Sequence, residues 1–187
     1  PFAWTLFSSL KSPSELYMFP PRWFPATPRF YNYVEVFNLS PFARWLWNSV
    51  VVAGLATFGA VLSAAVTGYS FARFRYPGRN LIFILTLSTL MLPAEVTLIP
   101  LYLLFNKIGW LDTYKPLIVP SFFGGGAFLI FMMRQFFLTI PMDLDEAARI
   151  DGAGYLRIFL QILLPLTIPA LVTAAIITFI GDWNAFL

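Results

Sequence analysis

Four long apolar segments determine what this chain can fold into. They run over about residues 48–74, 81–105, 116–137 and 162–180. A helix needs about 20 predominantly apolar residues to cross the hydrocarbon core of a bilayer, and each segment is close to that length. The chain is 59% hydrophobic and only 11% charged, whereas a soluble domain carries roughly 25% charged residues. The sequence therefore predicts an all-α fold, a polytopic transmembrane helix bundle in the lipid bilayer of the cell membrane.

Several kinds of chemistry are excluded by residues that the chain lacks. It contains no cysteine and no histidine, which excludes disulfides, thiolate or imidazole metal ligands and Cys-His or Ser-His catalytic pairs. It has no G-x-x-x-x-G-K-[ST] phosphate loop, the motif that would bind ATP. A net charge of +3 spread along the chain does not suit a nucleic-acid surface. We expect no catalytic residue, no metal and no cofactor, and no enzyme activity in this chain.

The chain divides into three predicted parts. Residues 1–10 are too short to cross a membrane and are typical of the end of a preceding transmembrane helix. Residues 11–47 are rich in proline, which prevents a continuous helix, and in aromatic side chains, which suit an extracytoplasmic loop at the membrane interface. Residues 48–187 form the transmembrane domain. Because both ends are cut within apolar segments, we expect a fragment of a longer protein, lacking most of its first and all of its last transmembrane helix.

Two patterns of small residues predict how the spans pack. Small residues recur at every fourth position of the first span, at Ala56, Ala60, Ala64, Gly68 and Ala72. Such a row lets helix backbones approach closely in a bilayer, where apolar helices gain nothing by leaving lipid. The triple glycine at 124–126 lies near the middle of the third span. It predicts tight helix contact or a bend, with a flexible gate as the bolder alternative.

A few polar residues in the apolar segments are candidates for a substrate pathway. Glu95 lies between Pro93 and Pro100, which should kink the second span. An intramembrane carboxylate usually faces a cavity or a partner, so Glu95 either lines a pathway or satisfies backbone groups freed by the prolines. In the last span, Thr178 and Asp182 continue a row of small residues, and Asn184 follows. That row fits a pathway, a contact with another subunit or simple packing.

The segment from Asp143 to Pro165 is a charged island between two apolar spans. Asp143 and Glu146 form a D-x-x-E capping pattern, which predicts a helix beginning at Leu144. Asp145 and Arg149 are spaced to form an ion pair along this helix. Gly152 should end the helix, and a second helix should lead into the last span. Arginines at positions 73, 75 and 79 mark the cytoplasmic end of the first span, which places the segment on the cytoplasmic side.

The spacing of this segment resembles a known family signature. Its pattern E-A-A-x3-G-x9-I-x-L-P is matched in full by Glu146, Ala147, Ala148, Gly152, Ile162, Leu164 and Pro165. It is similar to the cytoplasmic loop of the membrane subunits of binding-protein-dependent ABC importers. The wider form DEAARIDGA, the upstream FARFRYPGR and MLPAEVTLIPLY and the closing GDWNAFL narrow the resemblance. They are most similar to the carbohydrate-uptake branch, in particular its smaller, maltose-type permease subunit.

The resemblance implies a mechanical role in transport. The loop would be a coupling helix-turn-helix that docks on a cytoplasmic ATPase, with Glu146, Ala147, Ala148, Asp151 and Gly152 at the contact. The implied partners are a second permease subunit, two ATPase subunits and an extracytoplasmic solute-binding protein. The solute would be a sugar or a sugar-like molecule.

Two alternatives stay open on the sequence. The first is an ABC permease for another solute, such as a glycerol phosphate or a polyamine. The second is an ion-coupled secondary transporter that uses Glu95 as its titrating group; sparse intramembrane charge and the signature loop weigh against it.

Overall fold

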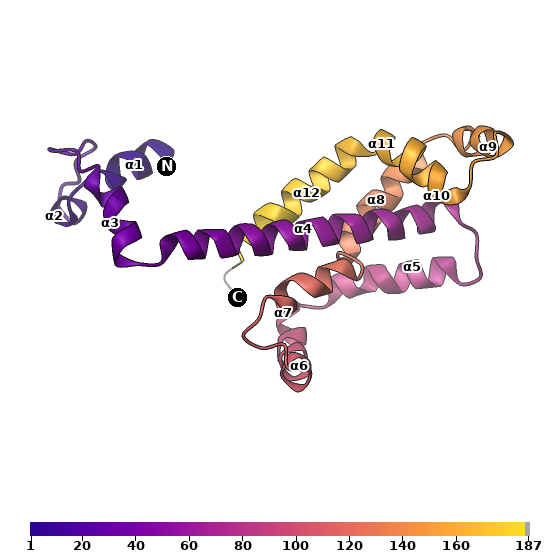
Figure 1. Cartoon of the computed structure of the whole chain (residues 1–187), viewed down its shortest axis with the longest axis horizontal. Helices are drawn as coiled ribbons and strands as arrows, with labels where there is room; N and C mark the ends of the chain where they lie inside the picture. Colours follow the sequence, from indigo (N-terminus) through magenta and orange to yellow (C-terminus); the bar gives the residue numbers. More distant parts are fainter. Residues whose placement is uncertain (186–187) are drawn as a thin grey trace. The chain divides into compact units, whose positions relative to one another are not determined.

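The computed structural model describes residues 1–185, and these residues contain helices and no strand. Phe186 and Leu187, which end the GDWNAFL motif, lie outside the described residues. The chain forms two compact units, Pro1–Asn48 and Ser49–Leu187. The α-helices are α1 Phe2–Ser9, α2 Pro13–Leu16, α3 Tyr31–Leu39, α4 Phe42–Arg73, α5 Arg79–Ser88, α6 Ala94–Lys107, α7 Lys115–Ile118, α8 Ala127–Thr139, α9 Asp143–Ile150, α10 Tyr155–Ile158, α11 Leu164–Leu166 and α12 Ile168–Trp183 (Figure 1). Two 3₁₀ turns, η1 Thr89–Met91 and η2 Val119–Phe122, and one π-helical turn, η3 Phe159–Leu163, complete the elements.

The N-terminal unit consists of short helices separated by proline-rich turns. Its longest helix, α3, occupies the proline-free interval between Pro28 and Pro41. Lys11 is only 3% exposed: its Nζ donates to the carbonyl oxygen of Arg22 at 2.6 Å and lies 4.1 Å from the centre of the Trp4 ring. Residues 11–41 contain no continuous helix, as the prolines predict, but α4 begins at Phe42, six residues before the predicted start of the first span. The assignment of residues 11–47 as an extracytoplasmic loop stays a prediction.

Helices long and apolar enough to cross a membrane confirm the predicted all-α membrane bundle; all but the first turns of α4 belong to the second unit. α4 has 32 residues and the segment Lys115–Thr139 has 25. Two further spans are formed if each of two bent pairs counts as one: Arg79–Met91 with Glu95–Lys107, and Tyr155–Leu166 with Ile168–Trp183. The first pair bends at Pro93, whereas α6 continues as a helix through Pro100. The chain therefore bends at one of the two predicted prolines.

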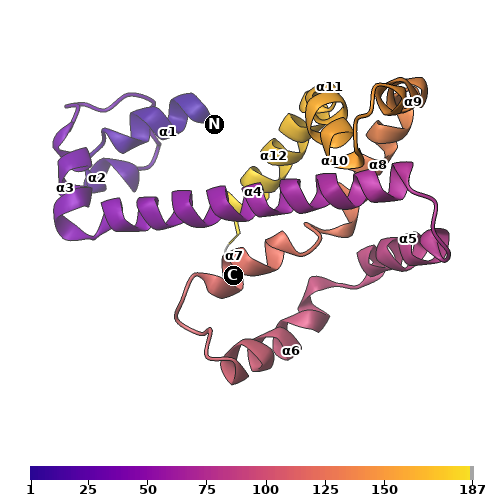
Figure 2. The same cartoon turned by 45° about the vertical axis from the view of Figure 1, so that its right-hand side comes forward.

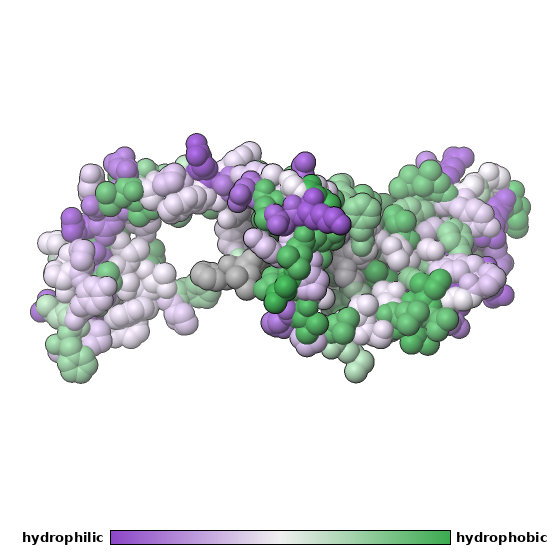
Figure 3. All heavy atoms as spheres, turned by 90° about the horizontal axis from the view of Figure 1, so that it is seen from below, coloured by the Kyte–Doolittle hydropathy of each residue, from purple (hydrophilic) through white to green (hydrophobic). Residues whose placement is uncertain are grey.

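The outer surface of this unit is apolar, as a lipid-facing surface must be. Figure 3 shows hydrophobic patches among more polar ones on one face, and large apolar residues such as Phe58, Leu62 and Val66 of α4 are roughly half exposed. The opposite face of α4 carries the predicted row of small residues: Ala56, Ala60 and Ala64 are at most 4% exposed. Along this part of α4, large side chains therefore face outward and small side chains face inward.

The α8 helix and the glycine segment before it pack against the face of α4 that carries the small residues. A Cβ atom on Gly68 would lie 2.8 Å from the Cβ of Met133 and 2.9 Å from the backbone nitrogen of Arg134. Gly125 has a positive φ of 62°, and a Cβ atom there would collide with the carbonyl oxygen of Ala60. The triple glycine therefore provides the tight contact, and it interrupts the helix between η2 and α8. Figure 2 shows α8 beside the C-terminal half of α4.

We expect Gly125→Ala to lower the stability of the bundle. The added methyl group overpacks the contact with Ala60, which costs about 1–3 kcal/mol, beyond the roughly 1–2 kcal/mol of a left-handed backbone in an L-residue. The matched control is Gly109→Ala, because Gly109 has a similar φ of 67° with no atom within 4 Å of an added Cβ. The midpoint of thermal unfolding in detergent should fall further for Gly125→Ala. Equal midpoints for the two variants would contradict the proposed contact.

Candidate functional site

The signature segment forms a helix, a sharp turn and a second helix, as predicted. α9 begins at Asp143, one residue before the predicted start, and its N-cap is Met142. No side chain caps this end, so the predicted D-x-x-E capping box is wrong. Asp143, Asp145 and Glu146 instead all lie in the first turn, where the positive end of the helix dipole stabilises carboxylates.

Gly152 ends α9 in the way that the sequence predicts. Its φ is +79°, the left-handed conformation that glycine adopts without a steric cost. The amide of Gly152 donates to the carbonyl oxygen of Arg149 at 3.0 Å, and the amide of Ala153 donates to that of Ala148 at 2.9 Å. These two bonds form a Schellman motif, which satisfies carbonyl groups at the end of the helix. The turn between the two helices is therefore fixed by backbone hydrogen bonds.

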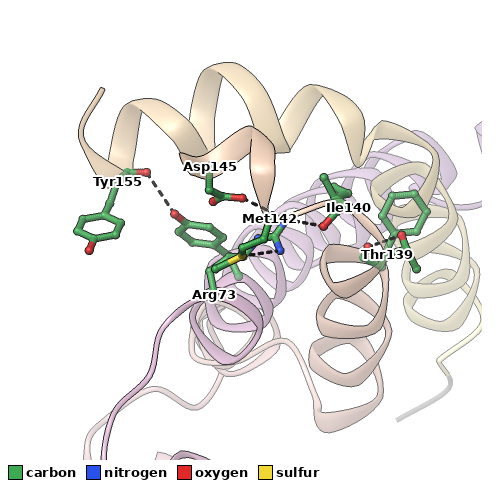
Figure 4. A network of polar contacts seen from close by, with 8 residues as sticks. Arg73, Thr139, Ile140, Met142, Asp145 and Tyr155 are labelled. Carbon is green, nitrogen blue, oxygen red and sulfur yellow. Dashed lines mark hydrogen bonds and ion pairs between the residues drawn. The ribbon is translucent and has the colours of Figure 1, made fainter. Parts of the chain in front are cut away.

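Asp145 points inward and does not pair with Arg149. Its Oδ2 lies 3.3 Å from Nη2 of Arg73, and the side chains are 3% and 4% exposed (Figure 4). Arg149 instead lies over the ring of Tyr155, 4.6 Å from its centre. The predicted Asp145–Arg149 pair is therefore wrong, because the inward position of Asp145 gives it a buried partner on another helix.

The other signature residues of α9 and its C-terminal turn are divided between the outer and inner faces. Glu146, Ala147, Asp151 and Gly152 are exposed, whereas Ala148 is 7% exposed and belongs to the buried core. The paired alanines therefore differ: Ala147 is open to a partner, and Ala148 lets α9 lie close to its own bundle. The role of all five residues in coupling stays a prediction.

The second half of the signature forms an irregular helix that leads into the last span. After α10 the chain makes the π-helical turn η3, passes through α11 with Pro165, and bends by 75° before α12. Ile158 and Leu163 are both fully buried. Tyr69 of α4 donates its hydroxyl hydrogen to the carbonyl oxygen of Tyr155 at 3.4 Å, which joins α4 to the start of α10.

The predicted pathway residues lie on different elements. Glu95 is exposed in the first turn of α6. Thr178 and Asp182 are half-buried near the end of α12, and Asn184 is exposed and donates to the carbonyl oxygen of Ile180 at 2.7 Å. Oδ2 of Asp182 is buried and has no hydrogen-bond partner among residues 1–185. In the same part of the chain, no hydrogen bond or ion pair joins Glu95 to these three residues.

Sequence reasoning missed the role of Arg73. We interpreted it only as one of three arginines that mark the cytoplasmic end of a span, yet it is 7% exposed, whereas Arg75 is exposed. Besides its ion pair with Asp145, it donates from Nη2 to the carbonyl oxygen of Ile140 at 2.9 Å. Periodicity gave no signal, because position 73 falls five residues after Gly68, about 140° around the helix from the row of small residues.

Comparison with known proteins agrees with this architecture. Residues 60–187 match the family described as binding-protein-dependent transport system inner membrane component. The diacetylchitobiose uptake system permease protein NgcG of Streptomyces coelicolor is 36% identical over the whole chain and 62% of its own length. The sn-glycerol-3-phosphate transport system permease protein UgpE of Yersinia enterocolitica is 43% identical over 80% of this chain and 53% of its own length.

A solved structure shares the fold. It is that of a bacterial ABC transporter involved in the import of the acidic polysaccharide alginate, with a TM-score of 0.80 and 26% identity over 99% of this chain and 65% of the other. The chain thus spans less than two thirds of the length of each of these relatives. The family match covers more than half of the chain and includes the whole signature segment. The chain therefore belongs to the binding-protein-dependent transport system inner membrane component family, as the signature spacing indicates.

Proposed function

We propose that this chain acts as a permease subunit of an ABC importer for a sugar or sugar-like solute. Its transmembrane helices form part of the translocation pathway, and ATP is hydrolysed on partner chains. The partners are a second permease subunit, two ATPase subunits and an extracytoplasmic solute-binding protein. Family membership leaves the ion-coupled alternative without support.

The geometry of α9 carries this proposal. Its inner face is held by buried Asp145 and Ala148, and its outer face presents Glu146 and Ala147. A short helix with a fixed base and a small, charged outer face suits insertion into a cleft of another protein. The chain has no phosphate loop of its own, so α9 is the element through which hydrolysis on an ATPase subunit reaches the membrane helices.

The solute class is inferred from the relatives and from the charge of the spans. One relative named above is a diacetylchitobiose permease and another a glycerol-phosphate permease. An anionic solute favours cations along its pathway, but α12 contains no Lys or Arg, and in α4 these residues are confined to Arg44 and Arg73. We therefore favour an uncharged sugar over a phosphate ester.

The last turns of α12 are the best-supported part of the pathway within this chain. Thr178 and Asp182 continue the row of Ala170 and Ala174, which are 6% and 0% exposed. This face of α12 therefore points into the bundle. A half-buried hydroxyl and a carboxylate with a free oxygen are the groups that bind sugar hydroxyls. We assign them, with Asn184 and with Glu95 of α6, to the pathway.

We expect Glu146→Lys and Gly152→Trp to uncouple transport. Charge reversal on the outer face of α9, or a large side chain at its exposed end, should block docking on the ATPase subunit. Uptake by the complete transporter in proteoliposomes should fall by about tenfold or more, a typical size for coupling between sites, while the permease still inserts into the membrane. Glu146→Gln and Gly152→Ala are the matched controls and should retain most uptake. Full uptake by both disruptive variants would refute the coupling role of α9.

A separate prediction concerns the pathway. Thr178→Val removes a hydroxyl from the inward face of α12 and should lower uptake of a labelled neutral disaccharide by about threefold to tenfold, the effect of one hydrogen bond. Thr173→Val is the control, because Thr173 is exposed and donates to the carbonyl oxygen of Pro169. Labelled sn-glycerol-3-phosphate, measured in parallel, should be taken up poorly. Equal rates for the two variants would remove Thr178 from the pathway, and preferential uptake of the phosphate ester would overturn the solute class.

A further inference from the structure

Arg73 is the last residue of α4, and its guanidinium lies under the first turn of α9. One terminal nitrogen, Nη2, lies 3.3 Å from Oδ2 of Asp145 and donates to the carbonyl oxygen of Ile140 at 2.9 Å. The other, Nη1, lies 3.2 Å from the sulfur of Met142. Figure 4 shows these three partners around the guanidinium. A single side chain of α4 therefore contacts the end of α8, the linker and α9.

The ion pair between Arg73 and Asp145 is buried, and its burial limits how much it can stabilise the fold. Both side chains are less than 5% exposed, and removing two charges from water costs about as much as their attraction returns. Nε of Arg73 and Oδ2 of Asp145 also lack a hydrogen-bond partner among the described residues, so the network is incompletely satisfied. A buried pair of this kind contributes little net stability, and what its geometry offers instead is a contact point between the elements that carry it.

α9 has few other fixed points. Asp145 and Ala148 are its only buried residues, and Arg73–Asp145 is the one ion pair found in residues 1–185. Ala148 supplies apolar contact, which tolerates sliding and rotation because dispersion is not directional. The ion pair adds a second fixed point, because it holds Asp145 close to a buried side chain of another helix. Contacts at both Asp145 and Ala148 limit the rotation of α9 about its own axis, and with it the direction in which the neighbouring Glu146 points.

The other end of the contact is the longest helix of the protein. α4 runs without a break over 32 residues, whereas the other candidate spans are bent or interrupted. A second bond, from the hydroxyl of Tyr69 to the carbonyl oxygen of Tyr155, joins the same end of α4 to α10. Both helices of the signature segment are thus attached to one turn of α4 by side-chain contacts (Figure 4).

We propose that Arg73 and Asp145 are positioning residues that fasten α9 to the end of α4. When the ATPase subunit displaces α9, α4 then moves together with α9, and the orientation of Glu146 is preserved. The proposal rests on the proposed coupling function and extends it from the contact surface to the buried attachment behind it.

The experiment uses the absence of cysteine from this chain. A single Ile150→Cys substitution, at a position that is 87% exposed on α9, carries a nitroxide spin label in the complete transporter. Asp145→Asn and Arg73→Met should each increase the mobility of this label and lower ATP-driven uptake by about tenfold or more. Asp143→Asn and Arg75→Gln are the controls: they remove exposed charges next to the pair and should change neither readout. Arg73→Lys keeps the charge and should restore part of the uptake.

The outcomes separate this proposal from the proposed function. An unchanged label in Asp145→Asn would overturn the positioning role, whatever happens to uptake. A mobile label with normal uptake would also overturn it, because the position of α9 would not matter for coupling. If Glu146→Lys uncouples transport and Asp145→Asn does not, only the positioning role fails. If neither variant affects uptake, the coupling function itself fails.

Discussion

Close approach between α4 and the segment that contains α8 is the contact on which the second unit depends. In lipid there is little hydrophobic gain from bringing two apolar helices together, so association must come from dense packing of backbones. The space for an added methyl group is already occupied at Gly68 and at Gly125. The bundle therefore has its tightest contact where its side chains are smallest. The aromatic and aliphatic core of Tyr69, Phe137 and Phe159 then fills the wider space toward the signature segment.

The packing of α4 against α8 also determines the surroundings of α9. α4 ends at Arg73, and α8 ends just before Ile140 and Met142, so the close approach of the two helices brings their ends together. The end of α4 provides the partner for Asp145, and Ile140 and Met142 provide two further partners for Arg73. The site thus consists of a buried base, supplied by the bundle, and an exposed face, supplied by α9. Sequence motifs describe the exposed face well, but the base exists only after the helices have packed.

This difference explains how far the sequence could predict the site. Spans, the bend at Pro93, the small face of α4 and the turn at Gly152 follow from local composition, because each depends on properties of one segment. The wrong predictions concern the kink at Pro100, the partner of Asp145 and the start of α9. Local rules favour Arg149 as the partner of Asp145 and Asp143 as a cap, yet the worth of such exposed local pairs is a few tenths of a kcal/mol. Asp145 instead faces inward toward a buried arginine from a helix about seventy residues earlier, and no local pattern reveals that arginine.

The π-helical turn at Phe159–Leu163 affects which side of the last span faces into the bundle. Ile158 and Leu163 are five residues apart and both fully buried, a spacing that places residues on different sides of an α-helix, which advances 100° per residue. The wider turn absorbs one extra residue and brings both side chains to one side. Deleting a residue here would restore a regular helix and rotate everything beyond it by about 100°. The rotation of α12 relative to α9 therefore depends on a single additional residue. The apolar sequence FLQIL does not reveal that residue.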